Sequence, residues 1–467
     1  MWKGTSDSQS FYAIRPECSD DVPKTRFKPR SGRTLSARRW HASFSQEGHL
    51  DIAKVLSRTQ RGGVHPSIRG EVWEFLLGCF DPKSTYEERN QLRQQRREQY
   101  GRWKKECQDL DAVIGSGKVI TTPIITEDGY PIQDLVGEKP DKAVPVNLQR
   151  GDNYTLDDSQ DEKFEGVNSK AAADGFVNMD VSISDAPLNK KIIRWKLTLH
   201  QIGLDVVRTD RTLLFYENQE NLARLWDILS VYSWIDEDIG YCQGMSDLCS
   251  PMVILLENEA DAFWCFEHLM RKLRGNFRCT VSSIGVQSQL DKLASVIRTL
   301  DPKLHQHLEM LDGGNYLFAF RMLMVLFRRE FSFGDSLFLW ELMWALEYDP
   351  NLFSSYKVLG SAALNSGLAK GKDKMKQYGK FERENMKNGK NKESPPISVF
   401  VVAGVLKAKS SRLLKEASGL DDVVKVLSLS HGLDDVVKVL SVSLTRHIHL
   451  SLSHTHKHMR LADVCRR

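Results

Sequence analysis

The chain has 467 residues, of which 41% are hydrophobic and 9% aromatic, and its formal net charge is +4. This hydrophobic content is sufficient for a sizeable core and argues against a chain that is disordered throughout. The small net charge does not indicate a nucleic-acid-binding protein, so no nucleic-acid partner is expected.

The eight cysteines are scattered and form no CxxC pair. Reduced thiols in the cytosol are therefore expected. The sequence contains no apolar run long enough to span a bilayer, and its first ten residues lack the apolar core of a signal peptide. These features predict a cytoplasmic protein, with a peripheral position on endomembranes as the second interpretation.

The sequence predicts three regions. Residues 1–50 are polar and mixed in charge, which predicts a flexible N-terminal segment. From about residue 51 apolar positions recur at helical spacing, as in Ile68, Val72 and Phe75, and a large domain is expected over 51–430. Residues 431–467 form an atypical tail.

Residues 119–186 interrupt the helical pattern. Gly, Pro and Asp recur there, and from residue 151 to 186 nine acidic residues accompany only two basic ones. Such a segment predicts a long, disordered acidic loop inserted into the domain. A solvated linker is the simpler interpretation, and a role in partner specificity is the alternative.

The segment from 188 to 346 carries apolar stripes at three- and four-residue steps, including Leu290–Leu300 and a stripe from Leu317 through Phe320 to Phe327. Alternating runs with hairpin turns are absent from the sequence. We therefore predict an all-α, multi-helix fold.

Two features follow this helical part. Residues 370–392 hold nine basic and three acidic residues. They predict a basic loop, either a solvated linker or a weak peripheral contact with anionic membranes. The sequence GLDDVVKVLS occurs at 419–428 and again at 432–441, before a His-rich end. These histidines lack an accompanying cysteine or carboxylate cluster, so no metal site is expected.

Known catalytic motifs give no support for a self-contained active site. The sequence has no GxxxxGK[ST] loop, HExxH, GxSxG or kinase signature. A cofactor of its own is accordingly not expected.

Three other segments occur in a specific order: GVHPSIRGEVWEFLLG at 63–78, WKLTLHQIGLDVVRTDRTLLFYE at 195–217, and IDEDIGYCQGMSDLCSPMVILLE at 235–257. Together they resemble the RGxxW, IxxDxxRT and YxQGM segments of the TBC domain, the GTPase-activating module for Rab proteins. The resemblance covers roughly 60–430.

The resemblance implies that the chain accelerates GTP hydrolysis by a Rab-family small GTPase and so regulates vesicle trafficking. Arg208 of IxxDxxRT would be an arginine finger, and Gln243 of YxQ a glutamine finger that orients the attacking water. Both would act in trans, on GTP and Mg²⁺ carried by the partner. A guanidinium and an amide suit these tasks because one is a permanent forked cation and the other both donates and accepts hydrogen bonds.

The resemblance also implies supporting residues near the fingers. Asp205 would support the loop or hold Arg208. Arg211 is a second candidate for the finger, although a structural salt bridge suits it better. Tyr241 and Gly244 would shape the turn that presents Gln243.

Arg69 and Trp73 of the first segment are expected to anchor helix packing, with Trp73 buried. A non-catalytic scaffold that binds a Rab through the same helical surface is the alternative function. The presence of both fingers favours an activator of a partner GTPase.

Overall fold

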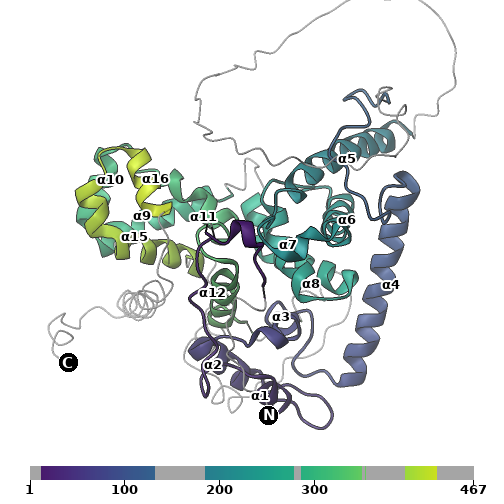
Figure 1. Cartoon of the computed structure of the whole chain (residues 1–467), viewed down its shortest axis with the longest axis horizontal. Coiled ribbons are helices and arrows are strands. Elements are labelled where there is room, and N and C mark those ends of the chain that lie inside the picture. Colours follow the sequence, from purple (N-terminus) through teal and green to yellow (C-terminus); the bar gives the residue numbers. More distant parts are fainter. Residues whose placement is uncertain are drawn as a thin grey trace, which may run out of the picture. The chain divides into compact units, whose positions relative to one another are not determined.

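The computed structural model describes residues 12–20, 22–131, 185–277, 285–349, 353 and 395–428. In these residues helices predominate, and the only β-type pairings are isolated bridges, so the all-α prediction is confirmed (Figure 1). The 3₁₀ helices are η2 (Pro16–Cys18), η3 (Pro66–Ile68), η5 (Leu214–Glu217) and η6 (Leu317–Ala319). The α-helices are α1 (Ala37–His41), α2 (Ile52–Gly62), α3 (Arg69–Leu76), α4 (Tyr86–Leu110), α5 (Asp185–Val206), α6 (Gln219–Ile235), α7 (Met245–Leu255), α8 (Glu259–Phe277), α9 (Gln287–Leu300), α10 (Pro302–Met310), α11 (Phe320–Met324), α12 (Phe333–Leu346), α15 (Ile397–Glu416) and α16 (Leu420–Ser428).

The chain divides into two compact units, one made of residues 1–122 and 198–467 and the other of residues 123–197. In the smaller unit a tight turn joins Ile125 to Pro131 in an antiparallel bridge, next to the first part of α5. Gly129 has a φ of 83°, and a Cβ there would lie 2.7 Å from Ile193. The larger unit contains all the other helices and the sequence motifs discussed below.

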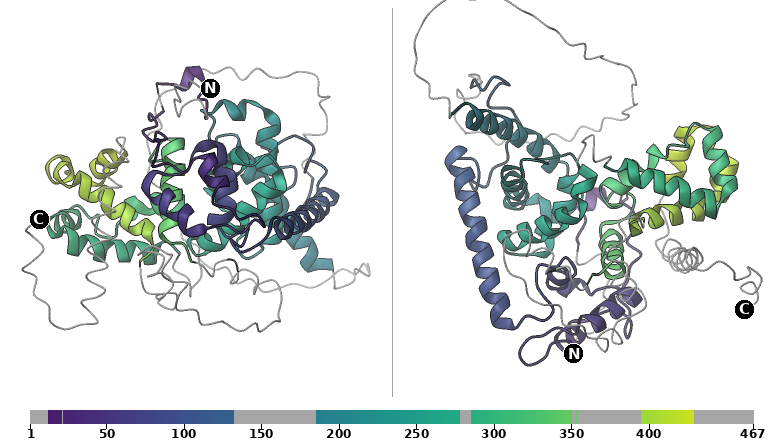
Figure 2. Two further views of the ribbon diagram at one scale, coloured as in Figure 1. Left: turned by 90° about the horizontal axis from the view of Figure 1, so that it is seen from below. Right: turned by 180° about the vertical axis from the view of Figure 1, so that it is seen from behind.

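The larger unit has one core built around α6, α7, α8, α3 and α12. Helix α7 packs between α6 and α8, and α12 packs against α2 and α3 (Figures 1 and 2). Three tryptophans join α3 to α12: Trp73, Trp340 and Trp344 have ring centroids 4.8 to 5.9 Å apart. All three rings are buried, so this contact removes a large apolar area from water.

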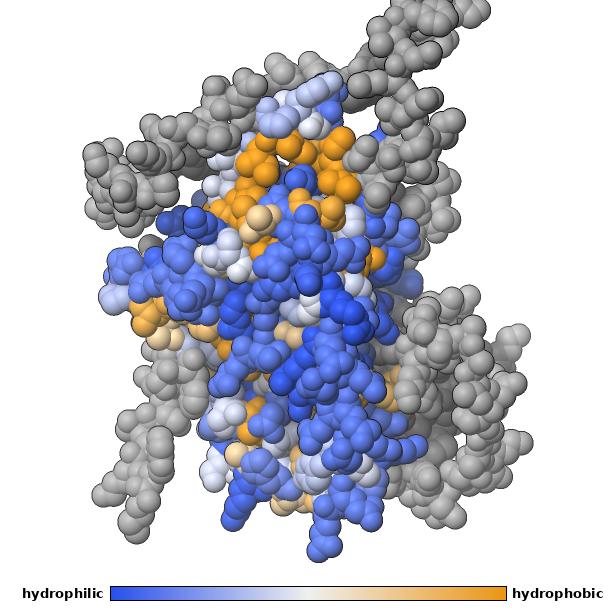
Figure 3. Space-filling model, turned by 90° about the vertical axis from the view of Figure 1, so that its right-hand side faces the viewer, coloured by the Kyte–Doolittle hydropathy of each residue, from blue (hydrophilic) through white to orange (hydrophobic). Residues whose placement is uncertain are grey.

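Helix α4 begins with a capping box in which Thr85 and Glu88 satisfy each other's backbone amides. Its sequence is charged on most faces, yet one face is anchored to the core of the larger unit. Arg97 pairs with Asp261 of α8 at 2.6 Å, and Lys104 pairs with Glu259 at 2.6 Å. The face of the molecule on the α4 side is predominantly hydrophilic (Figure 3).

A second group of helices lies beside this core within the larger unit. Helix α9 packs against α10 and α15, and α16 packs against α15 (Figure 2). Lys407 of α15 reaches Asp301, at the start of α10, at 2.7 Å, and Ser410 donates to the same carboxylate at 2.8 Å. The first copy of the duplicated sequence thus forms α16, while the second copy lies outside the described residues.

The sequence predicts a flexible segment over residues 1–50, and within it residues 22–50 make close contacts with the rest of the larger unit. Phe27, Leu35 and Trp40 are buried, and the amides of Arg26 and Phe27 donate to the Asp335 carboxylate at 2.7 to 3.1 Å. These apolar residues are too widely spaced in the sequence to form a periodic pattern, because they lie in irregular chain and in the short helix α1. Residues 12–20 also pack against other parts of this unit.

The predicted helix from Leu317 to Phe327 is corrected. Helix α11 ends at Met324, and Leu326 and Phe327 adopt positive φ values of 47° and 62°. Both side chains are nevertheless buried. The apolar stripe continues into the core while the backbone turns away from the helical path.

Other predicted segments lie outside the described residues: 132–184 of the acidic insertion, the basic loop at 370–392, and the tail at 431–467. None of the described helices combines the length and apolar character that crossing a bilayer requires.

Candidate functional site

Arg208 lies on a turn just after α5 ends at Val206. Residues 207–213, called here the finger loop, contain Asp210 with a φ of 46°. The hydroxyl of Thr209 is buried; it donates to the backbone oxygen of Asp205 at 2.7 Å and shares a hydrogen bond with the Ser246 hydroxyl of α7 at 2.8 Å. The sequence therefore bends back here, leaving the Arg208 side chain 54% exposed.

Gln243 lies on the turn that leads from α6 into α7. Gly244 is the N-cap of α7, with a φ of 98°, and a Cβ on it would lie 2.7 Å from Val325. Both the backbone conformation and the space thus require glycine. Gln243 is exposed, and among the described residues no hydrogen-bond partner engages its side-chain amide.

The two turns face a common depression of about 390 Å³. Arg208 and Gln243 line it together with Asp205 and Arg211. The other lining residues are Thr209, Asp210, Thr212, Ser246, Asp247, Arg328 and Arg329. Four residues that the motifs singled out are thus brought together, and the depression is open and strongly polar.

Asp205 links the two turns. Its carboxylate is buried and accepts hydrogen bonds from the Arg208 guanidinium through one oxygen. The other oxygen accepts the hydroxyl of Tyr241 at 2.7 Å. Burial raises the pKa of Tyr241 above its ordinary value, and the neighbouring Asp205 carboxylate raises it further. Tyr241 therefore remains a protonated donor.

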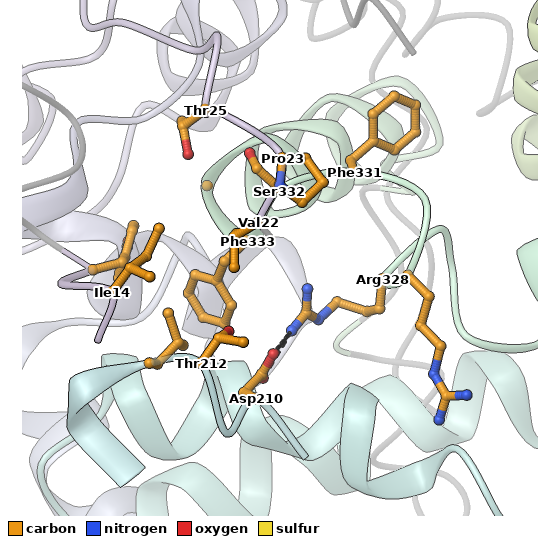
Figure 4. Close-up of a pocket in the computed structure, with 14 residues that line it drawn as sticks. Ile14, Val22, Pro23, Thr25, Asp210, Thr212, Arg328, Phe331, Ser332 and Phe333 are labelled. Carbon is orange, nitrogen blue, oxygen red and sulfur yellow. Dashed lines mark hydrogen bonds and ion pairs between the residues drawn. The ribbon is translucent and has the colours of Figure 1, made fainter. Parts of the chain in front are cut away.

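A second network of hydrogen bonds holds the finger loop against α7 and against the segment that precedes α12. Arg328 donates to both oxygens of Asp210, at 2.6 and 2.7 Å, and Ser250 donates to one of them at 2.6 Å. The hydroxyl of Tyr216 donates to Ser250 at 2.9 Å. The Arg328 guanidinium lies 4.8 Å from the centre of the Phe333 ring (Figure 4).

Sequence reasoning missed Arg328 and its neighbour Arg329. Arg329 pairs with Asp247 of α7 at 2.9 Å and remains 45% exposed. The sequence does contain a sign of their role, because the two arginines directly follow a long apolar stripe. A charged residue at such a position needs either a buried partner or contact with solvent.

The structural salt bridge expected of Arg211 is not made with any described residue. Its side chain is exposed at the rim of the depression. The neighbouring Asp210 carboxylate pairs with Arg328 instead.

Arg69 and Trp73 lie away from the depression, in the core of the larger unit. Arg69 is buried and donates to Glu341 of α12 at 2.5 Å, and the Trp73 indole donates to the same oxygen at 3.1 Å. Glu341 also accepts the amide of Val64 at 3.2 Å. These residues join α3 to α12.

The donor set of the depression is rich in guanidinium groups, which suits phosphate oxygens and not a cation. Across the described ranges no group of three His, Cys, Asp or Glu side chains could hold a metal ion. An exposed arginine and an exposed amide beside an open depression suit a site completed by another molecule.

Comparison with known proteins agrees with this arrangement. The Rab-GTPase-TBC domain model matches residues 176–359. The chain is 31% identical to Rab GTPase-activating protein 22 of Arabidopsis thaliana, over 67% of this chain and 66% of that protein. It is 31% identical to TBC1 domain family member 17 of Homo sapiens, over 69% of this chain and 38% of that protein.

A fission yeast relative, GTPase-activating protein gyp7 of Schizosaccharomyces pombe, is 28% identical over 69% of this chain and 36% of its own length. The chain therefore spans about two thirds or less of the relatives it matches. The crystal structure of the Ypt/Rab-GAP domain of Gyp1p has a TM-score of 0.53 with this structure at 15% identity, covering 88% of this chain and 98% of that one. That likeness concerns the fold alone.

Fold, motifs and comparisons define a helical domain of the TBC class. This chain belongs to the Rab-GTPase-TBC domain family.

Proposed function

We propose that this chain accelerates GTP hydrolysis by a Rab-family small GTPase, with Arg208 and Gln243 inserted into the partner's nucleotide site. The observation that carries this proposal is the position of both side chains, exposed at one depression on two turns that Asp205 and Tyr241 link. The GTP and the Mg²⁺ belong to the partner, and the chain supplies no cofactor.

The proposed task of Arg208 follows from the chemistry of phosphoryl transfer. Negative charge shifts onto the γ-phosphoryl and bridging oxygens in the transition state, and a guanidinium neutralises it best where water is excluded. The side chain of Arg208 is half-exposed and held by one carboxylate oxygen. It therefore retains donors that a phosphate can engage.

The proposed task of Gln243 is to orient the attacking water. Its amide offers both a donor and an acceptor, and Gly244 allows the backbone turn on which it stands. Tyr241 and Asp205 are positioning residues in this proposal. Arg211, exposed at the rim, is available for contact with the partner's surface.

The broader biological role belongs to the same proposal. A Rab activator of this kind would regulate vesicle trafficking from the cytoplasm or from a peripheral position on endomembranes. The basic residues at 370–392 would add weak attraction to anionic lipids. Vesicle sedimentation at low and high salt tests this attraction, which is expected to vanish at high salt.

The direct test is single-turnover GTP hydrolysis across a panel of Rab GTPases, using the wild-type chain, Arg208→Ala and Gln243→Ala. An arginine finger contributes about 10³–10⁵ in rate, so Arg208→Ala is expected to abolish the acceleration of the responsive GTPase. The alternative, a scaffold that binds a Rab without catalysis, wins if the wild-type chain binds a GTPase but accelerates none.

A further inference from the structure

The segment before α1 reaches the finger loop from the other end of the sequence. Residues 12–16, called here the strap, run antiparallel to residues 212–214. The amide of Arg15 donates to the backbone oxygen of Thr212 at 2.8 Å, and the amide of Leu214 donates to the oxygen of Ala13 at 2.8 Å. Ile14 and Leu213 form the bridge between these two hydrogen bonds.

The strap is itself attached to the core. Tyr12 accepts a hydrogen bond from the buried Arg69 at 2.9 Å, and its ring packs edge-on against Phe333 with centroids 4.9 Å apart. Further along, the Asp335 carboxylate accepts the amides of Arg26 and Phe27. The described residues 12–20 and 22–27, called here the wall, are thus attached to the core at both ends.

This wall and the finger loop together line a pocket of about 250 Å³. Ile14, Val22 and Pro23 line one side, and Asp210 with its partner Arg328 lines the other (Figure 4). The same Asp210, Arg328 and Arg329 line the depression that holds Arg208 and Gln243. The strap therefore contacts one side of the finger loop, and the depression lined by Arg208 and Gln243 lies on its other side.

The loop needs such support because its own backbone is irregular. It leaves α5, passes through the left-handed conformation at Asp210, and enters η5 at Leu214. Thr209 and Asp210 are fixed by side chains of α7 and by Arg328. The backbone groups of Thr212 and Leu214 have the strap as their partner, while the amide of Leu213 donates to Asp210 within the loop.

We infer that the strap is a positioning element for the finger loop, and that residues outside the matched region 176–359 therefore set the catalytic rate. The inference rests on the proposed function. Because the strap touches the loop and not the depression that faces the partner, it acts on the rate at saturation and leaves affinity for the GTPase unchanged.

Arg15 allows this to be tested at one hydrogen bond. Its φ of −59° and ψ of 134° are values that proline adopts, so Arg15→Pro keeps the local backbone conformation, removes the N–H and places the proline ring against the Thr212 oxygen. Arg15→Ala is the matched control, since it keeps the N–H and removes only the half-exposed ion pair with Glu217 at 3.5 Å.

The experiment uses the full chain and measures single-turnover GTP hydrolysis by the responsive Rab at increasing activator concentration. Loss of a positioning hydrogen bond predicts a saturating rate about tenfold lower for Arg15→Pro than for Arg15→Ala, with the half-saturating concentration unchanged. Hydrogen exchange of peptides covering 207–214 is expected to be faster in Arg15→Pro alone. A chain lacking residues 1–20 removes both hydrogen bonds and is expected to show the same two effects, more strongly.

Equal exchange in 207–214 for the proline and alanine variants overturns the inference, whatever the activity. So does a changed half-saturating concentration at an unchanged rate, because the strap would then contact the partner. If the wild-type chain accelerates no GTPase, the proposed function fails, and the exchange measurement alone decides whether the strap holds the loop.

Discussion

Arg328 holds Asp210 through a single nitrogen that lies 2.6 and 2.7 Å from the two carboxylate oxygens, joining parts of the chain 118 residues apart. Asp210 follows Arg208 by two residues and has a φ of 46°. Because the Arg328 side chain is buried, this pair fixes the finger loop to the segment that precedes α12. The position of Arg208 thus depends on a contact that the finger motif does not contain.

Arg328→Met is expected to destabilise the fold. Among the described residues it leaves the Asp210 carboxylate, mostly buried, with Ser250 as its one remaining side-chain donor. Removing one partner of a buried pair costs about 3–5 kcal/mol, and the partial exposure of Asp210 favours the lower end. Denaturant unfolding monitored by circular dichroism measures the loss.

Arg329→Met is the matched control for that variant. Arg329 is 45% exposed, whereas Arg328 is buried, and its partner Asp247 lies in the first turn of α7, where the helix N-terminus also stabilises a carboxylate. A smaller loss of stability is therefore expected. An equal loss of stability in the two variants would show that the Asp210–Arg328 pair has no special role.

Gly244→Ala is expected to impair both stability and GTPase activation. The φ of 98° is strained for alanine, and the new Cβ would meet Val325 at 2.7 Å. The strain alone costs about 1–3 kcal/mol, and relief of it would shift the neighbouring Gln243. Thermal unfolding and the single-turnover rate measure the two effects.

Gly101→Ala serves as its control. Gly101 lies within α4, and a Cβ there would meet nothing within 4 Å. Alanine is favoured over glycine inside a helix by about 0.5–1 kcal/mol, so this variant should unfold at a higher temperature. If Gly244→Ala is as stable as wild type, the turn before α7 does not require glycine.

Tyr241→Phe tests the link between the two turns. It removes the donor to the buried Asp205 carboxylate, and hydrogen bonds to charged groups contribute about 1.5–3 kcal/mol. Arg208 remains beside Asp205, so the larger effect is expected on the presentation of Gln243. A lower saturating rate with wild-type affinity is the expected result.

The same variant has a defined pH dependence. The pKa of Tyr241 is raised by burial above its ordinary value of 10.0, so the folded state retains the proton more firmly than the unfolded state. The stability that wild type has over Tyr241→Phe is therefore constant below pH 10.0 and declines as the pH rises above it. Unfolding of both proteins at pH 8 to 11 measures this difference, and a difference that grows with pH would contradict it.

The sequence was sufficient to predict the helical class and those residues of the depression that stand in the IxxDxxRT and YxQGM segments. Arg208 and Gln243 stand in short segments whose order is informative, and helical periodicity indicates the class of fold. Asp210 stands within the same segment, yet its partner Arg328 could not be assigned. The pairing depends on positive φ values at Asp210, Leu326 and Phe327, which no local pattern of L-residues indicates.

The N-terminal part illustrates a second limit. Residues 12–50 are polar on average, and their few large apolar residues follow no periodicity, so the sequence indicated a loose segment. In the structure Trp40 donates to Glu71 at 2.6 Å, and Phe27 stacks on Phe338 with centroids 4.6 Å apart. A segment of this kind is held by residues that lie far away in the sequence, and composition does not reveal such partners.

The proposed role of Arg208 lies in the transition state of GTP hydrolysis and not in binding of the GTP-loaded partner. The most direct measurement compares the affinity of wild type and Arg208→Ala for the responsive Rab, loaded either with a non-hydrolysable GTP analogue or with GDP and aluminium fluoride, a mimic of the transferring phosphoryl group. Wild type is expected to prefer the mimic by at least about a hundredfold, and Arg208→Ala to lose that preference while its affinity for the analogue-loaded form stays the same. An undiminished preference in Arg208→Ala would contradict a role of Arg208 in the transition state.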